Sequence, residues 1–346
     1  MPEAPNLALD GDDRRRIADA LRYLGRDLHH RSFGVTSERR ELLWQEMDDC
    51  LALAERIAGE TDRAVAQQPL EPPALEPGKG AVLITGASSG IGAALARRLA
   101  PTLSGSDAPL VLTARRLERL EALAAELAHR HAIRVDTIPA DLAQAGGAKV
   151  LLQVLQQRQV AVHTLINNAG FGLRGSFEAV AWPQAEAMLQ LMVGSCAELC
   201  HALLPAMQQA GSGRIVNVAS LAGLVPGLPG STLYGACKAF LIHFSQSLAL
   251  ENRDRGVRVM ALCPGYVHSE FHAVLGVEER MRQRLPGLLW MNAEELADLT
   301  IAALEGSRTV VVPGAVNRLI AALADSLPEP ATNALSTAFS RRFRQE

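Results

Sequence analysis

Two groups of residues in this 346-residue chain have types and spacings suited to a chemical reaction. Residues 85–92 read Thr-Gly-Ala-Ser-Ser-Gly-Ile-Gly, a loop whose backbone can approach the phosphates of a dinucleotide. Further along, Tyr234 and Lys238 are spaced Tyr-x-x-x-Lys and would share one face of a helix. A phenol beside an ammonium group can pass a proton to a carbonyl oxygen. Together they predict hydride exchange between a nicotinamide and a carbonyl or alcohol.

The glycine loop predicts how the pyrophosphate of such a cofactor is held. Gly86 follows an apolar run at 81–84 and permits a tight turn, while Gly90 and Gly92 remove side chains where the backbone must approach the pyrophosphate or pack closely. A helix beginning near Gly90 would direct its free N–H groups and its positive dipole end at the phosphates. The motif is only modestly specific alone, but here it stands between a predicted strand and a predicted helix.

The end of the second predicted strand indicates which nicotinamide cofactor is used. An acidic residue there would bind the ribose 2′-hydroxyl of NAD(H), but the chain has Ala114, Arg115 and Arg116. A guanidinium can clamp a 2′-phosphate with two hydrogen bonds and stack on adenine. We therefore expect NADP(H) rather than NAD(H). The alternative is that both arginines are solvated charges at the start of a helix.

The proton chemistry of Tyr234 requires help from its neighbours. An isolated tyrosine has a pKa near ~10, and roughly 2–3 units of lowering would suit neutral pH. A cation ~4 Å away at an effective dielectric constant of ~20 supplies about 4 kcal/mol, so Lys238 is sufficient to lower the pKa. Ser220 would donate to the substrate oxygen and hold it near Tyr234. Without Ser220 and the glycine loop, an exposed pair without a function would be the better interpretation.

From Gly80 to about Val312, the chain resembles the short-chain dehydrogenase/reductase family in its NADP-preferring form. Six motifs stand in the family's order over about two thirds of the chain. They are Thr85–Gly92, Asp141-Leu142, Asn167-Asn168-Ala169-Gly170, Ser220, Tyr234-x-x-x-Lys238 and Pro264-Gly265-Tyr266-Val267-His268-Ser269.

The resemblance implies a role for each of these positions. Ser220, Tyr234 and Lys238 would be catalytic. Asp141 would contact the adenine, and Ser269, where the family more often has Thr, would meet the nicotinamide carboxamide. Asn167 would hold the central strand. The implied cofactor-binding residues are Gly86, Ser88, Ser89, Gly90, Ile91, Gly92, Arg115, Arg116, Asp141, Leu142, Asn168, Ala169, Gly170, Tyr234, Lys238, Pro264, Gly265, Val267 and Ser269.

One position departs from the family's pattern. The family usually has an Asn before the Leu-Pro that ends its fourth helix, and this chain has Met192 there. That Asn supports a water linking the lysine to solvent, and a thioether is only a weak hydrogen-bond acceptor. Three alternatives follow: Ser195 or a backbone carbonyl supports a shifted water, proton exchange is slower, or the protein is a non-catalytic member.

The order of elements predicts a doubly wound α/β (Rossmann) parallel sheet. Short apolar runs alternate with helical stretches, as expected for buried parallel strands joined by crossover helices. The runs are Ala81–Ile84, Leu110–Thr113, Val135–Ile138, Thr164–Ile166, Arg214–Val218, Val257–Leu262 and Thr309–Val312. We expect an N-terminal helical hairpin at 1–68, a Pro-rich linker at 69–79, the dehydrogenase/reductase domain at 80–313 and a C-terminal helical tail at 314–346.

The N-terminal hairpin is predicted from two apolar stripes at helical spacing. Gly34 would lie in the turn between them. The hairpin is too small to bury its own core, so it would be a structural appendage or, alternatively, a lid or partner-docking module. The two stripes are Ile17, Leu21, Leu24 and Leu28, and then Leu43, Met47, Cys50, Ala54 and Ile57.

The composition excludes several classes of function. A net charge of −3 gives no argument for binding nucleic acid. No long uninterrupted apolar stretch predicts a membrane span, and no signal peptide is evident, so we expect a cytoplasmic protein. Cys196 and Cys200 are interpreted as core residues and His268 and His272 as parts of a substrate loop, so no metal site is predicted. A homodimer or homotetramer is implied by the resemblance.

The stretch from Tyr266 to Met291 predicts the character of the substrate. It should form a loop over the substrate, and its apolar residues suit a hydrophobic ketone or aldehyde, or the matching alcohol. They are Phe271, Val274, Leu275, Leu285, Leu288, Leu289 and Trp290, joined by Phe171 and Leu224–Val225. The main alternative is a non-catalytic NADP(H)-binding protein whose N-terminal helices dock a partner. An isomerase or epimerase on the same scaffold is a third alternative.

Overall fold

The structure is a computed structural model that describes residues 72–173, 175–270 and 286–326, with single positions and short runs nearer both ends. The chain divides into two compact units, Met1–Leu70 and Glu71–Glu346. In the first unit, helix is recorded at Ile17 and Leu21 and at positions 39, 41–43, 45–50 and 53. Both predicted stripes therefore have helical members. The remaining hairpin residues, including Gly34, lie outside the described residues, so the hairpin stays a prediction.

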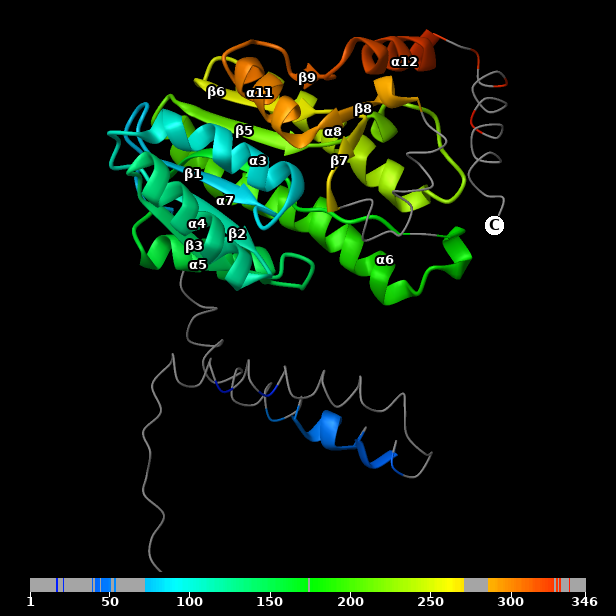
Figure 1. Ribbon diagram of the computed structural model, residues 1–346, viewed down its shortest axis with the longest axis horizontal. Coiled ribbons are helices and arrows are strands. Elements are labelled where there is room, and N and C mark those ends of the chain that lie inside the picture. The colour runs from blue at the N-terminus through cyan, green and yellow to red at the C-terminus, as the bar shows by residue number, and fades with distance from the viewer. Residues whose placement is uncertain are drawn as a thin grey trace, which may run out of the picture. The chain divides into compact units, whose positions relative to one another are not determined.

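Seven parallel strands form one sheet in the described part of the second unit, in the order β3-β2-β1-β4-β5-β6-β9 (Figure 1). The order reverses between β1 and β4, the place where open α/β sheets bind ligands. This confirms the predicted doubly wound sheet. The strands are β1 (Ala81–Thr85), β2 (Leu110–Ala114), β3 (Val135–Pro139), β4 (Val162–Asn167), β5 (Gly213–Val218), β6 (Val257–Leu262) and β9 (Val310–Val311).

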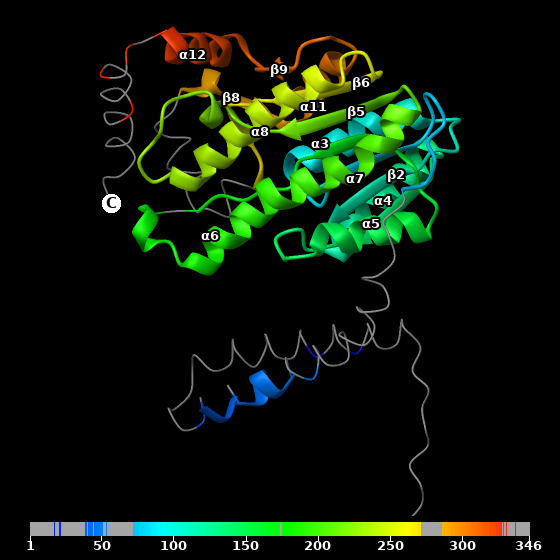
Figure 2. The ribbon, with the colours of Figure 1, turned by 180° about the vertical axis from the view of Figure 1, so that it is seen from behind.

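Helices cover both faces of the sheet, as comparison of Figure 1 with Figure 2 shows. The first face carries α3 (Gly90–Leu99), α4 (Leu117–His131) and α11 (Ala293–Leu304), which share one apolar core with β1 and β2. The second face carries α5 (Gly147–Gln157), α7 (Ser195–Gln209) and α8 (Thr232–Glu251). Coverage on both sides explains the apolar runs within the strands, and all five residues of β1 are buried.

The described part of the second unit also contains two short strands and a helix near its C-terminal end. Strand β7 (Tyr266–His268) pairs in parallel with β8 (Trp290–Asn292), outside the main sheet. Helix α12 (Ala315–Ser326) provides one of the predicted C-terminal helices. The described end of the Pro-rich segment lies with this unit, because Leu75 is buried and its Cδ1 would be 2.4 Å from a Cβ placed on Gly80.

A long helical stretch, Trp182–Gln209, qualifies the expectation of no membrane span. It joins α6 (Trp182–Leu189), a π-helical turn at Gln190–Gly194, and α7. By length and composition alone this stretch could cross a membrane, but 39% of its most apolar window is buried inside the protein. Helix α7 packs on β4, β5 and α5, as a core helix of an α/β domain does.

A buried polar network ties α8 to the sheet. The side-chain oxygen of Asn217 on β5 accepts from Asn167 Nδ2 on β4 at 2.9 Å. Asn217 Nδ2 in turn donates to Ser245 Oγ on α8, also at 2.9 Å. All three side chains are buried, so each hydrogen bond replaces water that these groups have lost. The network therefore fixes the position of the helix that carries Tyr234 and Lys238.

The first prediction concerns this network. Asn217→Ala should lower the free energy of unfolding by about 2–4 kcal/mol, because it leaves buried partners unsatisfied and opens a cavity. Asn292→Ala is the matched control, since Asn292 is exposed and makes no side-chain cap hydrogen bond, and it should cost less than about 0.5 kcal/mol. Urea unfolding followed by circular dichroism measures both. Equal values for the two variants would contradict the structural role of the network.

Candidate active site

The predicted site residues meet at the carboxyl edge of the parallel sheet. The glycine loop follows β1, the two arginines follow β2, and Asp141 and Leu142 follow β3. Asn168–Gly170 follow β4, Ser220 follows β5, and Pro264–Ser269 follow β6. Parallel strands bring all their carboxyl ends to one edge, which is where ligands of open α/β sheets bind. Residues far apart in the sequence therefore lie along one edge of the sheet.

The glycine loop has the shape that an anion-binding turn requires. Gly86 has a φ of +66°, and a Cβ there would be 2.8 Å from Ala169 Cα. A Cβ on Gly92 would be 2.5 Å from the carbonyl oxygen of Gly86, so only glycine fits at either position. Helix α3 begins at Gly90 with no side-chain cap and no acidic residue in its first turn. Its N-terminal N–H groups are thus suited to a phosphate.

Asn168 supports this loop from β4. Its backbone N–H donates to Thr85 Oγ1 at 2.9 Å, and the Ala169 N–H donates to the same oxygen at 3.0 Å. The Asn168 side-chain amide donates to the carbonyl oxygens of Thr85 and Gly86. The implied cofactor role of Asn168 therefore includes holding the turn itself, through its side chain.

The structure brings Ser220, Tyr234 and Lys238 together. The hydroxyls of Ser220 and Tyr234 are hydrogen bonded. Lys238 is buried, its Nζ lies 5.6 Å from the centroid of the Tyr234 ring, and it donates to the carbonyl oxygen of Val218 at 2.7 Å. The turn after Ser220 packs directly on α8, because a Cβ on Gly223 would be 2.5 Å from the carbonyl carbon of Lys238. This close approach sets Ser220 opposite Tyr234.

The pKa values at this site correct the expectation for Tyr234. Burial raises the pKa of Tyr234 to about 12, and the hydrogen bond with Ser220 opposes that rise only in part. Burial also lowers the pKa of Lys238 to about 8. Lys238 was expected to lower the pKa of Tyr234, but loss of hydration on burial is the largest influence and raises the pKa instead. Tyr234 is therefore protonated at neutral pH, which suits proton donation to an oxygen that becomes basic.

Met192 lies in the π-helical turn between α6 and α7. Its side chain is buried in a cluster with Met188 and Cys237. A Cβ on Gly170 would be 3.0 Å from Met192 Cε and 3.8 Å from Lys238 Nζ. The thioether thus lies against Gly170 near the ammonium group, where it offers no strong hydrogen bond.

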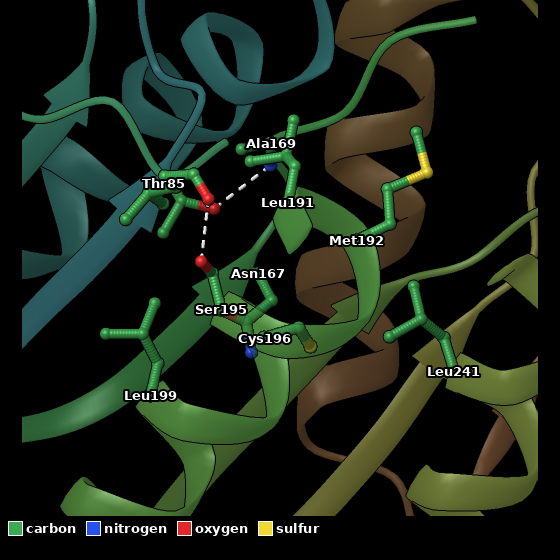
Figure 3. Close-up of a pocket in the computed structure, with 10 residues that line it drawn as sticks. Thr85, Asn167, Ala169, Leu191, Met192, Ser195, Cys196, Leu199 and Leu241 are labelled. Atoms are coloured by element: carbon green, nitrogen blue, oxygen red, sulfur yellow. Dashed lines mark hydrogen bonds between the residues drawn. The ribbon is translucent and has the colours of Figure 1, made fainter. Parts of the chain in front are cut away.

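A small cavity lies beside this turn (Figure 3). Its volume is about 10 Å³, the size of one water molecule, and Thr85, Asn167 and Ser195 supply polar lining. Ser195 Oγ donates to the carbonyl oxygen of Leu142 at 2.6 Å. Lys238 does not line the cavity, so this space alone does not provide the shifted water considered for Met192.

The two arginines after β2 differ in their surroundings. Arg116 Nη2 donates to Ser88 Oγ at 3.1 Å and to Ser89 Oγ at 2.9 Å, so its guanidinium lies on the glycine loop. Its Nη1 pairs with Glu270. Arg115 is exposed, and within the described residues it makes no hydrogen bond. Of the predicted pair, Arg116 is therefore the one that contacts the glycine loop.

The remaining predicted residues support the same edge. Asp141 accepts from the Ala143 N–H at 3.1 Å and so shapes its own turn. The carbonyl oxygen of Pro264 accepts from the Leu221 N–H at 2.8 Å, which joins the segment after β6 to the Ser220 turn. Gly265 packs on Asn317, Val267 is buried in the core, and Ile91 packs partly against it. Ser269 lies against Gly90, since their Cβ atoms would be 3.1 Å apart.

Comparison with known proteins identifies the family. A family model described as short chain dehydrogenase matches residues 80–279, more than half of the chain. The chain belongs to the short-chain dehydrogenase family. Sulfoacetaldehyde reductase of Chromohalobacter salexigens is 40% identical over 224 residues, which cover 63% of this chain and 85% of that one.

Solved structures of short-chain dehydrogenases match as well. One from Sphingobium yanoikuyae, in complex with NADPH, has a TM-score of 0.61 and 32% identity over 72% of this chain and 97% of that one. The bulky-bulky ketone specific alcohol dehydrogenase of Comamonas testosteroni has a TM-score of 0.58 and 30% identity over 78% of this chain and 95% of that one. The family supports oxidoreductase chemistry at the edge described above.

The predicted substrate loop of this short-chain dehydrogenase is described only in part. Phe271, Val274, Leu275 and Leu285, together with His272, lie outside the described residues. Trp290 stacks on His268 with ring centroids 4.7 Å apart, and Tyr266 lies against the same indole at 5.4 Å. Within the described residues, no group of three metal-binding side chains gathers. His268 thus belongs to the aromatic cluster that Trp290 forms with it and with Tyr266.

Three residues that help to shape the site were not identified from the sequence. Gly223 brings the Ser220 turn onto α8, and Glu270 and Arg119 form an ion pair beside Arg116. Gly223 carried a weak signal, since a glycine shortly after Ser220 suggests close packing. Nothing in the linear sequence pairs Glu270 with an arginine that lies so far away along the chain.

A second prediction follows from Met192. Met192→Asn should leave turnover unchanged or raise it, because an amide beside Lys238 can hold a water where the thioether cannot. Met192→Leu, which keeps an apolar side chain of similar volume, is the control and should behave as the native protein. The measurement is kcat between pH 6 and 10 with melting temperatures for each variant. A large loss in Met192→Asn alone, without lower thermal stability, would show that the methionine has its own role.

A third prediction follows from the buried Lys238. Its pKa falls from 10.5 to about 8 on folding, so the unfolded chain binds more protons between these values and stability rises with pH there. Lys238→Met should abolish activity yet raise the free energy of unfolding by about 2–3 kcal/mol at pH 7, a gain that shrinks by pH 10. Exposed Lys79→Met is the control. Urea titrations at both pH values that give the same gain would contradict the assignment.

Proposed function

We propose that this protein is an NADP(H)-dependent reductase of hydrophobic ketones or aldehydes, acting also on the matching alcohols in reverse. The observation that carries the proposal is the convergence of Ser220, Tyr234 and Lys238 beside the glycine loop at one edge of the sheet. The family match supports oxidoreductase chemistry, and the sulfoacetaldehyde reductase and ketone-specific relatives support a carbonyl substrate.

The chain's own residues perform the proton half of the reaction. When bound, NADP(H) supplies or accepts the hydride. The hydroxyls of Ser220 and Tyr234 converge, so both can donate hydrogen bonds to a carbonyl oxygen placed between them. As negative charge develops on that oxygen, Tyr234 transfers its proton to it. The Lys238 ammonium then stabilises the resulting phenolate, because it stays mostly protonated at neutral pH with a pKa of about 8.

The choice of NADP(H) rests on Arg116. Arg116 follows β2, and its guanidinium lies on Ser88 and Ser89 of the glycine loop, where the cofactor's adenosine ribose is expected. A guanidinium there favours a 2′-phosphate over a free hydroxyl. No carboxylate directly follows β2 to hold the 2′-hydroxyl of NAD(H). The NADPH complex of the Sphingobium relative supports the same choice.

The apolar substrate class rests on residues around Tyr234. Phe171, Leu173 and Leu233 are partly buried in the cluster that contains Tyr234 and Met192. Tyr266 and Trp290 form the aromatic cluster on β7 and β8. Such surroundings favour a substrate with an apolar body and one carbonyl group. They offer little to a polar sugar nucleotide, so an epimerase on this scaffold is not proposed.

The fourth prediction tests the proposed reaction. Tyr234→Phe should lower kcat by about 10²- to 10⁴-fold, because it removes the proton donor while keeping the ring. NADPH binding, followed by its fluorescence, should change by less than about threefold. Turnover is followed by NADPH absorbance with a panel of bulky apolar ketones, aliphatic aldehydes and a small anionic aldehyde.

The outcomes separate the candidate functions. Loss of turnover with NADPH binding retained supports the reductase. If the native protein binds NADPH but turns over none of the panel, the non-catalytic NADP(H)-binding alternative is favoured. Greater activity on the small anionic aldehyde than on bulky ketones would contradict the hydrophobic substrate class and leave the reaction type intact.

A further inference from the structure

Glu270 makes an ion-pair cluster that the proposed reaction does not use. Its Oε2 accepts from Arg116 Nη1 at 3.1 Å, and its Oε1 accepts from Arg119 Nη1 at 2.5 Å. Each carboxylate oxygen thus has its own arginine, and these two hydrogen bonds lower the pKa of Glu270. Both arginines come from the start of α4, whereas Glu270 follows the segment after β6. The cluster therefore joins two parts of the chain that are far apart in the sequence, at the carboxyl edge of the sheet.

The position of this carboxylate is set by the glycine loop. Ser269, the residue before Glu270, lies so close to Gly90 that Cβ atoms on the two would be 3.1 Å apart. Arg116, while paired with Glu270, also donates to the hydroxyls of Ser88 and Ser89. The carboxylate thus sits beside the loop, on the guanidinium expected to hold the 2′-phosphate of the cofactor.

A chance surface ion pair would have different features. Other pairs in the described residues, such as Arg97 with Glu126 and Arg214 with Glu305, join one arginine to one carboxylate away from the glycine loop. Glu270 instead takes two arginines at once, and one of them contacts the glycine loop. Two guanidinium groups around one set of acceptor oxygens is the arrangement that suits a phosphate.

We propose that Glu270 occupies the 2′-phosphate site as an internal anion, and that Arg119 is the second arginine of that site. The inference rests on the proposed use of NADP(H). A 2′-phosphate must displace the carboxylate from Arg116 and Arg119, whereas a free 2′-hydroxyl leaves the ion pairs in place. Glu270 therefore weakens the binding of NADP(H) and hardly affects NAD(H), which lowers the discrimination between the two.

The size of the effect follows from the exposure of the groups. The side chains of Arg116, Arg119 and Glu270 are between 42% and 48% exposed, so solvent screens their attraction. Exposed pairs are individually weak, but here two are broken and the displaced carboxylate would also repel the incoming phosphate. We expect removal of the Glu270 charge to tighten NADPH binding about threefold to tenfold. The Kd of NADH should stay within about 1.5-fold.

The fifth prediction is a binding experiment on the full chain. NADPH and NADH are titrated against the native protein, Glu270→Gln and Glu305→Gln, with cofactor fluorescence as the readout. Glu305→Gln is the matched control, because it removes a carboxylate that pairs with one arginine, Arg214. Arg214 lies at the start of β5 and therefore at the edge of the sheet opposite the glycine loop. Glu270→Gln should bind NADPH more tightly without a matching gain for NADH, and Glu305→Gln should bind both as the native protein does.

Arg119 provides an independent arm of the test. Arg119→Gln should weaken NADPH binding about threefold to tenfold and leave NADH binding unchanged, since only the phosphate meets this side chain. In the double variant, the gain caused by Glu270→Gln should become smaller, because one of its two partners is gone. These shifts concern binding alone and need no substrate.

Three results would overturn the inference while leaving the proposed reductase intact. The first is weaker NADPH binding in Glu270→Gln, which would mean that Glu270 orients the arginines for the cofactor. The second is an equal change for NADPH and NADH, and the third is no change for either. If the native protein itself binds no NADPH, the proposed function fails and this inference fails with it.

Discussion

The site depends on one buried contact, the hydrogen bond from the Lys238 ammonium group to the carbonyl oxygen of Val218. Val218 ends β5, so this contact holds the start of α8 against the carboxyl edge of the sheet. Burial makes the charge costly and lowers the pKa of Lys238 to about 8. The surrounding fold must therefore hold Lys238 at a position where its charge is unfavourable. The buried hydrogen bonds among Asn167, Asn217 and Ser245 help to do so, because they fix α8 on the sheet.

The same burial explains why Tyr234 is poised as a donor. Its pKa of about 12 means that the phenol keeps its proton until a stronger base is formed beside it. A carbonyl oxygen that accepts a hydride becomes such a base, so the proton is transferred when the reaction needs it. An oxygen held by Ser220 is placed for that transfer, and the turn through Gly223 sets the distance. The packing of one glycine on α8 thus controls the chemistry of two hydroxyl groups.

Local patterns predicted the strands and the motif residues well, because each rests on short-range rules. Continuous apolar runs at 81–84 and 257–262 identify buried parallel strands, and the glycines at 86 and 92 have positions that only close packing requires. The sequence predicted a lowered pKa for Tyr234, whereas the structure gives a raised one. The sequence shows the positive charge of Lys238 but not how much water the buried phenol loses. The pairing of Glu270 with Arg116 and Arg119 needs the tertiary fold, since no local rule connects them.

The carboxyl edge of the sheet therefore combines two electrostatic environments. At one end, Lys238 and Tyr234 are removed from water, and their neighbours do not fully compensate for the lost hydration. Burial therefore has the largest influence on the pKa values of both groups. At the other end, the side chains of Arg116, Arg119 and Glu270 remain partly in water, so their ion pairs are weak and can exchange partners at modest cost. A dinucleotide spanning both ends would need a fixed environment at its reacting ring and an adaptable one at its ribose phosphate. The division follows from burial, because the Lys238 side chain is buried whereas those of Arg116, Arg119 and Glu270 are nearly half exposed.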